Sequence, residues 1–173
     1  EVNAQSNFLS LLERYGQVPL PPYIKKELKD SERYQTVFSD KPSSSAAPTA
    51  GLHFTQELLD ECRSMGARIE EIELAIGLDT FRPITVTDLD DHNMHSEFYN
   101  VSETVMESCR EAERVIAIGT TTVRALESAH LFGLSGQTKL FIRDPFEFQV
   151  VDVLLTNFHL PRSTLLVMIE AFI

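Results

Sequence analysis

Arg114-Val-Ile-Ala-Ile-Gly119 is followed directly by Thr120-Thr-Thr-Val-Arg124. The β-branched run predicts a buried strand, and we expect a helix from Thr120 to Phe132 that Gly133 closes. A helix that begins just after a buried strand directs free backbone N–H groups at whatever lies beyond that strand. Ordinary N-capping would explain one threonine there. Three hydroxyls at this turn also suit a carboxylate, a phosphate or a ribose, so the turn is a candidate ligand site.

Helices and strands alternate outward from this unit. Further helices are expected over 56–65, from a cap at Ser102 to about 113, and over 165–172, and further strands over 69–76, 138–142 and 150–155. This alternation predicts an α/β fold with a mainly parallel sheet and helices on both faces. An apolar helical stripe over 8–15 ends at Gly16, and prolines follow at 19, 21 and 22. We therefore divide the chain into a leading helix, 1–18, and an α/β domain, 19–173.

Three short segments combine histidine with polar side chains beside glycine or proline. They are Ala47-Pro-Thr-Ala-Gly-Leu-His-Phe54, Met94-His-Ser-Glu97 and Thr156-Asn-Phe-His-Leu-Pro-Arg-Ser-Thr-Leu165. Core packing does not require this mixture, so the segments indicate a polar site assembled from loops. His53 is a candidate general acid or base, and His95 with Glu97 could bind ribose hydroxyls or move protons.

Each candidate also has a purely structural interpretation. His53 could cap a helix entrance, Phe54 could pack in the core, and Asn157 with His159 could stabilise a turn before a helix capped by Ser163. The functional alternative for Asn157 and His159 is recognition of a base edge such as that of adenine. Arg82 could hold a phosphate or carboxylate with its planar guanidinium, or face solvent.

Two charged patterns leave alternatives open. Arg124 and Glu127 lie one helical turn apart, so they form either a surface pair or a functional pair that holds a carboxylate and accepts hydroxyls. The pattern His92-x-x-His95-x-Glu97 fits the spacing of zinc ligands, but no further ligand set accompanies it. We therefore expect no metal.

Five further segments occur in a fixed order with the three histidine segments: Pro19-Leu-Pro-Pro-Tyr-Ile24, Glu32-Arg-Tyr-Gln-Thr-Val37, Thr80-Phe-Arg-Pro83, Ile118-Gly-Thr-Thr-Thr-Val-Arg124 and Leu126-Glu-Ser128. This ordered set resembles the S-adenosylmethionine:tRNA ribosyltransferase-isomerases of queuosine biosynthesis. The chain departs from that family's pattern at Ser43-Ser-Ser45 and at Arg143-Asp-Pro-Phe146. It also has Ala75 where the family usually has His, and Asp79 where it usually has Gly.

The resemblance implies a specific reaction. S-adenosylmethionine would act as the co-substrate that donates its ribosyl part to 7-aminomethyl-7-deazaguanine at the tRNA wobble position. Adenine and methionine would leave, and the tRNA would carry epoxyqueuosine. The implied catalytic residues are His53, His95, Glu97 and His159. The implied ligand-binding residues are Thr49, Gly51, Phe54, Arg82, Thr120, Thr121, Thr122, Arg124, Glu127 and Asn157.

The resemblance also implies a larger protein. Family members are about twice as long as these 173 residues, so we expect a fragment of a two-domain protein whose β-barrel domain lies mostly outside the chain. We expect a cytoplasmic monomer, and no apolar run approaches the roughly 18 residues of a membrane span.

Composition bears on the nucleic-acid partner. The net charge is −11, whereas nucleic-acid-binding proteins usually present a basic face. Lys25, Lys26, Lys29 and Arg33 form one local basic cluster in the sequence. Either the tRNA contact is confined to a small patch, or much of it lies outside this chain.

Two other function classes compete with a transferase. One is an adenosyl- or nucleotide-binding α/β module that has lost the reaction, and the release of adenine would separate the two. The other is a zinc hydrolase that uses His92, His95 and Glu97, which metal analysis would test.

Overall fold

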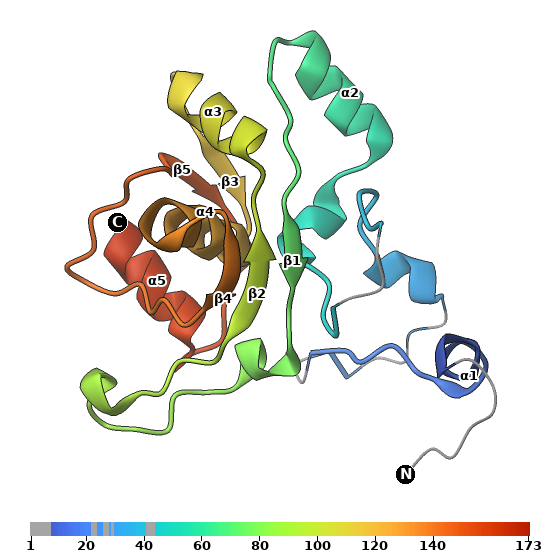
Figure 1. Cartoon of the computed structure of the whole chain (residues 1–173). Coiled ribbons are helices and arrows are strands. Elements are labelled where there is room, and N and C mark those ends of the chain that lie inside the picture. The colour runs from blue at the N-terminus through green and yellow to red at the C-terminus, as the bar shows by residue number, and fades with distance from the viewer. Residues whose placement is uncertain (1–7, 22–23, 26–27, 29, 41–43) are drawn as a thin grey trace.

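The computed structural model describes residues 8–21, 24–25, 28, 30–40 and 44–173. Five α-helices occur in this part of the chain: α1 Phe8–Tyr15, α2 Gln56–Ser64, α3 Glu103–Glu111, α4 Thr120–Phe132 and α5 Thr164–Phe172. Four short 3-10 helices accompany them: η1 Ser31–Tyr34, η2 Thr49–His53, η3 Leu78–Phe81 and η4 Leu89–Asp91. Helix α1 lies at the edge of the molecule, away from α4 and α5 (Figure 1).

The helix boundaries follow local capping signals. Thr55, Ser102 and Ser163 each accept a hydrogen bond through the side-chain oxygen from a backbone N–H in the first turn of α2, α3 and α5, respectively. Gly133 ends α4 with a φ of 109°, a conformation that favours glycine. The predicted helices are therefore confirmed to within two residues at each end.

The strands form two small sheets. Strand β2 (Glu97–Asn100) lies between β1 (Glu73–Ala75) and β4 (Ser135–Thr138), and both pairings are antiparallel. The other sheet is a parallel pair, β3 (Ile116–Ile118) with β5 (Val153–Leu155).

The prediction of a mainly parallel sheet is wrong, because the three-stranded sheet of the described residues is antiparallel. The β-branched and apolar runs of the sequence mark β3 and β5, which are indeed parallel. Strand β2 carries no such run, and β4 has the sequence Ser-Gly-Gln-Thr, so neither strand shows an apolar pattern. We expected a strand at 138–142, which is three residues too late.

Helix α4 occupies the middle of the core and contacts both sheets. Its residues from Val123 to Ala129 are all buried, and Val123 is fully inaccessible. They pack with Val101, Ile142, Val151 and Met168, which come from segments on all sides of the helix. Figure 1 shows α4 between β4 and the β3–β5 pair, with α5 beside it.

Hydrogen bonds fix α4 against the antiparallel sheet. The Tyr99 hydroxyl on β2 is buried and donates to the carbonyl of Gly133 at 2.8 Å. The hydroxyls of Ser128 on α4 and Thr138 on β4 lie 2.7 Å apart. These bonds hold β2 and α4 in register, so that polar side chains near the start of each element come together.

Candidate functional site

Segments from four parts of the sequence line one cavity of about 290 Å³. The cavity is lined by residues at the start of η2, residues around η3, the first turn of α4 and the loop after β5. The residues that line the cavity are Ala47, Pro48, Thr49, Ile76, Thr80, Pro83, Thr120, Thr121, Thr156, Asn157, Phe158, His159, Leu160, Pro161, Ser163 and Leu165. The structure thus brings together segments that are separated by more than a hundred positions.

The first turn of α4 forms one wall of the cavity. Gly119 precedes it with a φ of 94°, and no side chain caps the helix there. Thr120 and Thr121 line the cavity, whereas Thr122 does not; its hydroxyl donates to the carbonyl of Ile118 at 2.7 Å. Thr120 and Thr121 therefore face the cavity together with the N-terminus of α4, whereas Thr122 bonds back to the end of β3.

The first histidine segment reaches the cavity through a 3-10 helix. Gly51 is needed there because a Cβ atom would come within 2.5 Å of the Phe38 ring. Thr49 lines the cavity, but Gly51 and Phe54 are not among the lining residues. The Nε2 atom of His53 lies 2.9 Å from the Oδ1 atom of Asn157, which connects the segment to the loop after β5.

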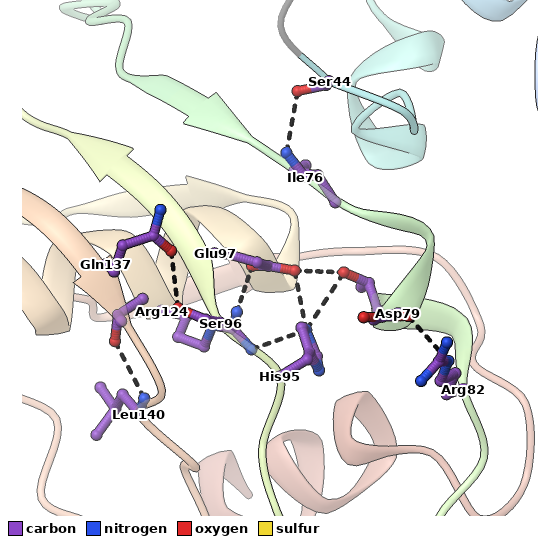
Figure 2. Close-up of polar contacts among 12 residues, drawn as sticks. Ser44, Ile76, Asp79, Arg82, His95, Ser96, Glu97, Arg124, Gln137 and Leu140 are labelled. Atoms are coloured by element: carbon purple, nitrogen blue, oxygen red, sulfur yellow. Dashed lines mark hydrogen bonds and ion pairs between the residues drawn. The ribbon is translucent and has the colours of Figure 1, made fainter. Parts of the chain in front are cut away.

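A buried group that we call the His–Glu–Arg cluster (His95, Glu97 and Arg124) lies next to the cavity. Nε2 of His95 is 3.0 Å from Oε1 of Glu97 and 3.2 Å from Nη1 of Arg124. Nη2 of Arg124 lies 2.5 Å from Oε2 of Glu97. Thr80 donates a short hydrogen bond to Oε1 of Glu97, and its hydroxyl is 3.3 Å from Nε2 of His95. Figure 2 shows Glu97 and His95 beside the η3 segment that carries Asp79.

The cluster combines a buried anion with a buried cation. The side chains of Glu97 and Arg124 are each 3% exposed, and that of His95 is 12% exposed. Burial alone would raise the pKa of Glu97, but the hydrogen bond from His95, the charge of Arg124 and the hydrogen bond from Thr80 outweigh it, so this pKa lies below its ordinary value. Glu97 is therefore ionised at neutral pH, and Arg124 balances its charge.

His159 also lines the cavity. Its Nε2 atom is 3.2 Å from the hydroxyl of Thr156. Burial lowers the pKa of His159, so the imidazole is neutral at pH 7. A neutral imidazole in the wall can exchange a proton with a bound ligand or accept a hydrogen bond from it.

The structure gives Glu127 a different role from the predicted one. Its side chain is fully inaccessible, and its two carboxylate oxygens accept backbone hydrogen bonds from Gln149, Val150 and Val151 at 3.0 Å each. The prediction that Glu127 contacts a ligand is wrong, because the carboxylate is occupied by the segment before β5. The predicted pairing of Arg124 with Glu127 is also wrong, because Arg124 pairs with Glu97.

Arg82 lies outside the cavity lining. Its Nε atom is 2.8 Å from Oδ1 of Asp79, and its side chain is 79% exposed. Asp79 is one of the positions at which the chain departs from the family pattern, and this departure supplies the partner of Arg82. The other departure on this segment, Ala75, lies on β1 and is half-buried. Ligand binding by Arg82 stays a prediction.

The described residues do not form the zinc site considered for His92, His95 and Glu97. Among the described residues, no three His, Cys, Asp or Glu side chains are placed to hold a metal ion. His92 packs against the Phe141 ring at a centroid distance of 5.3 Å, whereas His95 joins the His–Glu–Arg cluster. Within the same residues, no helix is both long and apolar enough to cross a membrane.

Several lining residues escaped the site prediction, among them Thr80 and Phe158. Thr80 belongs to Thr80-Phe-Arg-Pro83, one of the segments that carry the family resemblance. Arg82 is the residue of this segment that we predicted to bind a ligand. Phe158 stands between Asn157 and His159 with its side chain fully exposed at the cavity. Each residue lies in one of the motif segments, and this was the available indication, because neither residue type indicates chemistry by itself.

A comparison with protein families decides the relationship. A family model described as queuosine biosynthesis protein matches residues 1–173, which is the whole chain. The chain belongs to this queuosine biosynthesis family. The expected resemblance is thereby confirmed.

Individual members of the queuosine biosynthesis family support the same relationship. Proteins from Carboxydothermus hydrogenoformans and Natranaerobius thermophilus, both named S-adenosylmethionine:tRNA ribosyltransferase-isomerase, are 49% and 48% identical to the chain. Each alignment covers 97% of this chain and 52% of the relative. The chain therefore spans about half the length of the curated relatives it matches.

A solved structure of the queuosine family is similar as well. The crystal structure of S-adenosylmethionine tRNA ribosyltransferase from Thermotoga maritima matches with a TM-score of 0.56 and 40% sequence identity. The match covers 71% of this chain and 40% of that one. The mixed α/β fold of the chain thus has a counterpart in this family.

Proposed function

We propose that the protein containing this chain transfers the ribosyl part of S-adenosylmethionine to 7-aminomethyl-7-deazaguanine at the tRNA wobble position. Adenine and methionine leave, and epoxyqueuosine forms in the tRNA. The observation that carries the proposal is the convergence of the motif segments on one cavity beside the His–Glu–Arg cluster. Relatives with close to half of their residues identical bear the corresponding enzyme name.

The cavity offers suitable groups for the adenosyl and methionine parts. Thr120 and Thr121 place hydroxyls at the N-terminus of α4, where backbone N–H groups attract a carboxylate. Asn157 provides an amide in the loop after β5, suited to a base edge or a ribose hydroxyl. In this arrangement the methionine carboxylate lies at the helix and the adenine lies toward the loop after β5.

The proposed reaction needs a base and an acid. A base must remove a proton from the carbon next to the sulfonium, and an acid must protonate adenine as it leaves. The ionised Glu97 with His95 can take up the first proton by way of a water or hydroxyl in the cavity, and His53 can donate a proton to adenine. The neutral His159 can accept a hydrogen bond from the ligand. Arg124 keeps Glu97 charged in its buried position, so we assign it to the support of the base.

The proposal extends to partners and setting. We infer that the tRNA carries the aminomethyl deazaguanine before it meets the protein, and that the protein acts as a cytoplasmic monomer. We also propose that residues 19–173 form the α/β catalytic domain and that residues 1–18 lead from a β-barrel domain.

The test uses the intact protein, S-adenosylmethionine and tRNA that carries the modified wobble base. Free adenine and the tRNA nucleoside are measured together. We expect both adenine and epoxyqueuosine from the unaltered protein, and neither from the His95→Ala variant. His130→Ala is the matched control, because His130 is exposed near the end of α4. Bound S-adenosylmethionine without either product would favour the binding module instead.

A further inference from the structure

Thr80 is the contact between the cavity and the His–Glu–Arg cluster. Thr80 lines the cavity although it is only 3% exposed. None of the three cluster residues is among the lining residues. Thr80 is therefore a lining residue whose hydroxyl also bonds to the cluster.

The hydrogen bond to Glu97 fixes the orientation of the Thr80 hydroxyl. An ionised carboxylate only accepts, so the single hydrogen of Thr80 points at Oε1 of Glu97. The hydroxyl oxygen keeps two lone pairs. Nε2 of His95 lies 3.3 Å from this oxygen, and no other described residue donates to it, so one acceptor position stays open.

We propose that Thr80 relays protons between a hydroxyl, amine or water in the cavity and the Glu97–His95 pair. This role rests on the proposed function. In the forward step the donor's bond to hydrogen breaks, and its proton joins Thr80 Oγ1 as the former hydroxyl proton passes to Oε1 of Glu97. The donor keeps the electron pair, Thr80 is restored as a neutral hydroxyl, and Glu97 becomes neutral. The reverse step returns a proton to the cavity.

Three substitutions separate a relay from a packing role. Thr80→Val keeps the shape and removes the hydroxyl, Thr80→Ser keeps the hydroxyl, and Thr80→Ala opens room for a water molecule. A relay predicts that Thr80→Val lowers kcat for adenine release by about 100-fold or more. Thr80→Ser should keep most of the activity. Thr80→Ala should lose less than Thr80→Val, because a trapped water can connect the cavity to Glu97.

The controls ensure that folding and binding are intact. Urea unfolding and calorimetric titration with S-adenosylmethionine are measured for each variant, and the relay predicts a fall in kcat with little change in KM. Thr85→Val is the matched control, because Thr85 is exposed and does not line the cavity. If Thr80→Val does not fold, the order of activity of Thr80→Ser over Thr80→Ala still tests the relay.

The outcomes distinguish the two proposals. Normal turnover by Thr80→Val would overturn the relay alone. Equal losses in all three variants would also overturn it and indicate a packing role. Absence of adenine from the unaltered protein would remove the proposed function and the relay with it.

Discussion

At the scale of single residues, Glu97 and Arg124 depend on each other. Each side chain is 3% exposed, so removal of one charge leaves the other buried without a counter-charge. We expect Glu97→Gln to lower the free energy of unfolding by about 3–5 kcal/mol, as is typical when one partner of a buried pair is removed. Urea unfolding measures this loss.

The control is an exposed pair of the same kind. The side chains of Glu103 and Arg110 are 58% and 59% exposed, and solvent screens their attraction. Glu103→Gln should therefore lower the free energy of unfolding by less than about 1 kcal/mol. Similar losses in the two variants would contradict the buried ion pair.

The same pair predicts how stability depends on pH. The pKa of Glu97 is lowered in the folded protein, so its contribution to stability is present above its unfolded pKa of about 4.3. The contribution is lost as the pH falls through the lower, folded pKa. The stability gap between the unaltered protein and Glu97→Gln should be full at pH 6 and shrink below about pH 4. A gap that stays constant down to pH 2 would refute the lowered pKa.

Residue types predicted the site better than they predicted individual roles. His53, His95, Glu97, Asn157 and His159 came from polar segments whose composition was unusual for a core, and the structure places them in or beside one cavity. Glu127 was misassigned because its partners lie 22 to 24 positions further along the chain. Local spacing cannot reveal such a partner.

At the scale of elements, α4 holds the segment before β5 through Glu127. Three backbone N–H groups donate to this carboxylate, and its loss leaves the N–H of the buried Val151 unsatisfied. Glu127→Ala should lower the free energy of unfolding by about 2 kcal/mol or more. Hydrogen exchange should accelerate at Gln149, Val150 and Val151.

Glu147→Ala serves as the comparison, because Glu147 is exposed in the same segment. It should leave both stability and exchange nearly unchanged. If Glu127→Ala leaves the exchange of these three amides unchanged, the anchoring role is wrong.

The elements also show which parts of the fold a sequence can reveal. Helix ends depend on caps such as Thr55, Ser102 and Ser163, which act within one turn, so the helices were predicted closely. Strand β2 depends on pairing with β1 and β4, whose paired residues lie 23 to 41 positions away. That pairing, rather than any local apolar pattern, makes Glu97–Asn100 a strand and brings Glu97 to Arg124.

At the scale of the whole molecule, the acidic composition limits how the proposed tRNA substrate can be held. With a net charge of −11, we expect few phosphate contacts and a shallow dependence of tRNA affinity on salt. Replacement of Lys25, Lys26 and Lys29 by Gln should reduce the log–log salt slope by roughly 2 to 3, if each lysine neutralises one phosphate. An unchanged slope would place the tRNA contact elsewhere in the protein.

The central claim is that S-adenosylmethionine lies in the cavity beside the His–Glu–Arg cluster. The most direct measurement is a crystal structure of the protein with this substrate bound. We predict its carboxylate near Thr121 at the N-terminus of α4, its adenine near Asn157, and a polar group within hydrogen-bond distance of Thr80. Well-ordered substrate bound away from this cavity would contradict the account.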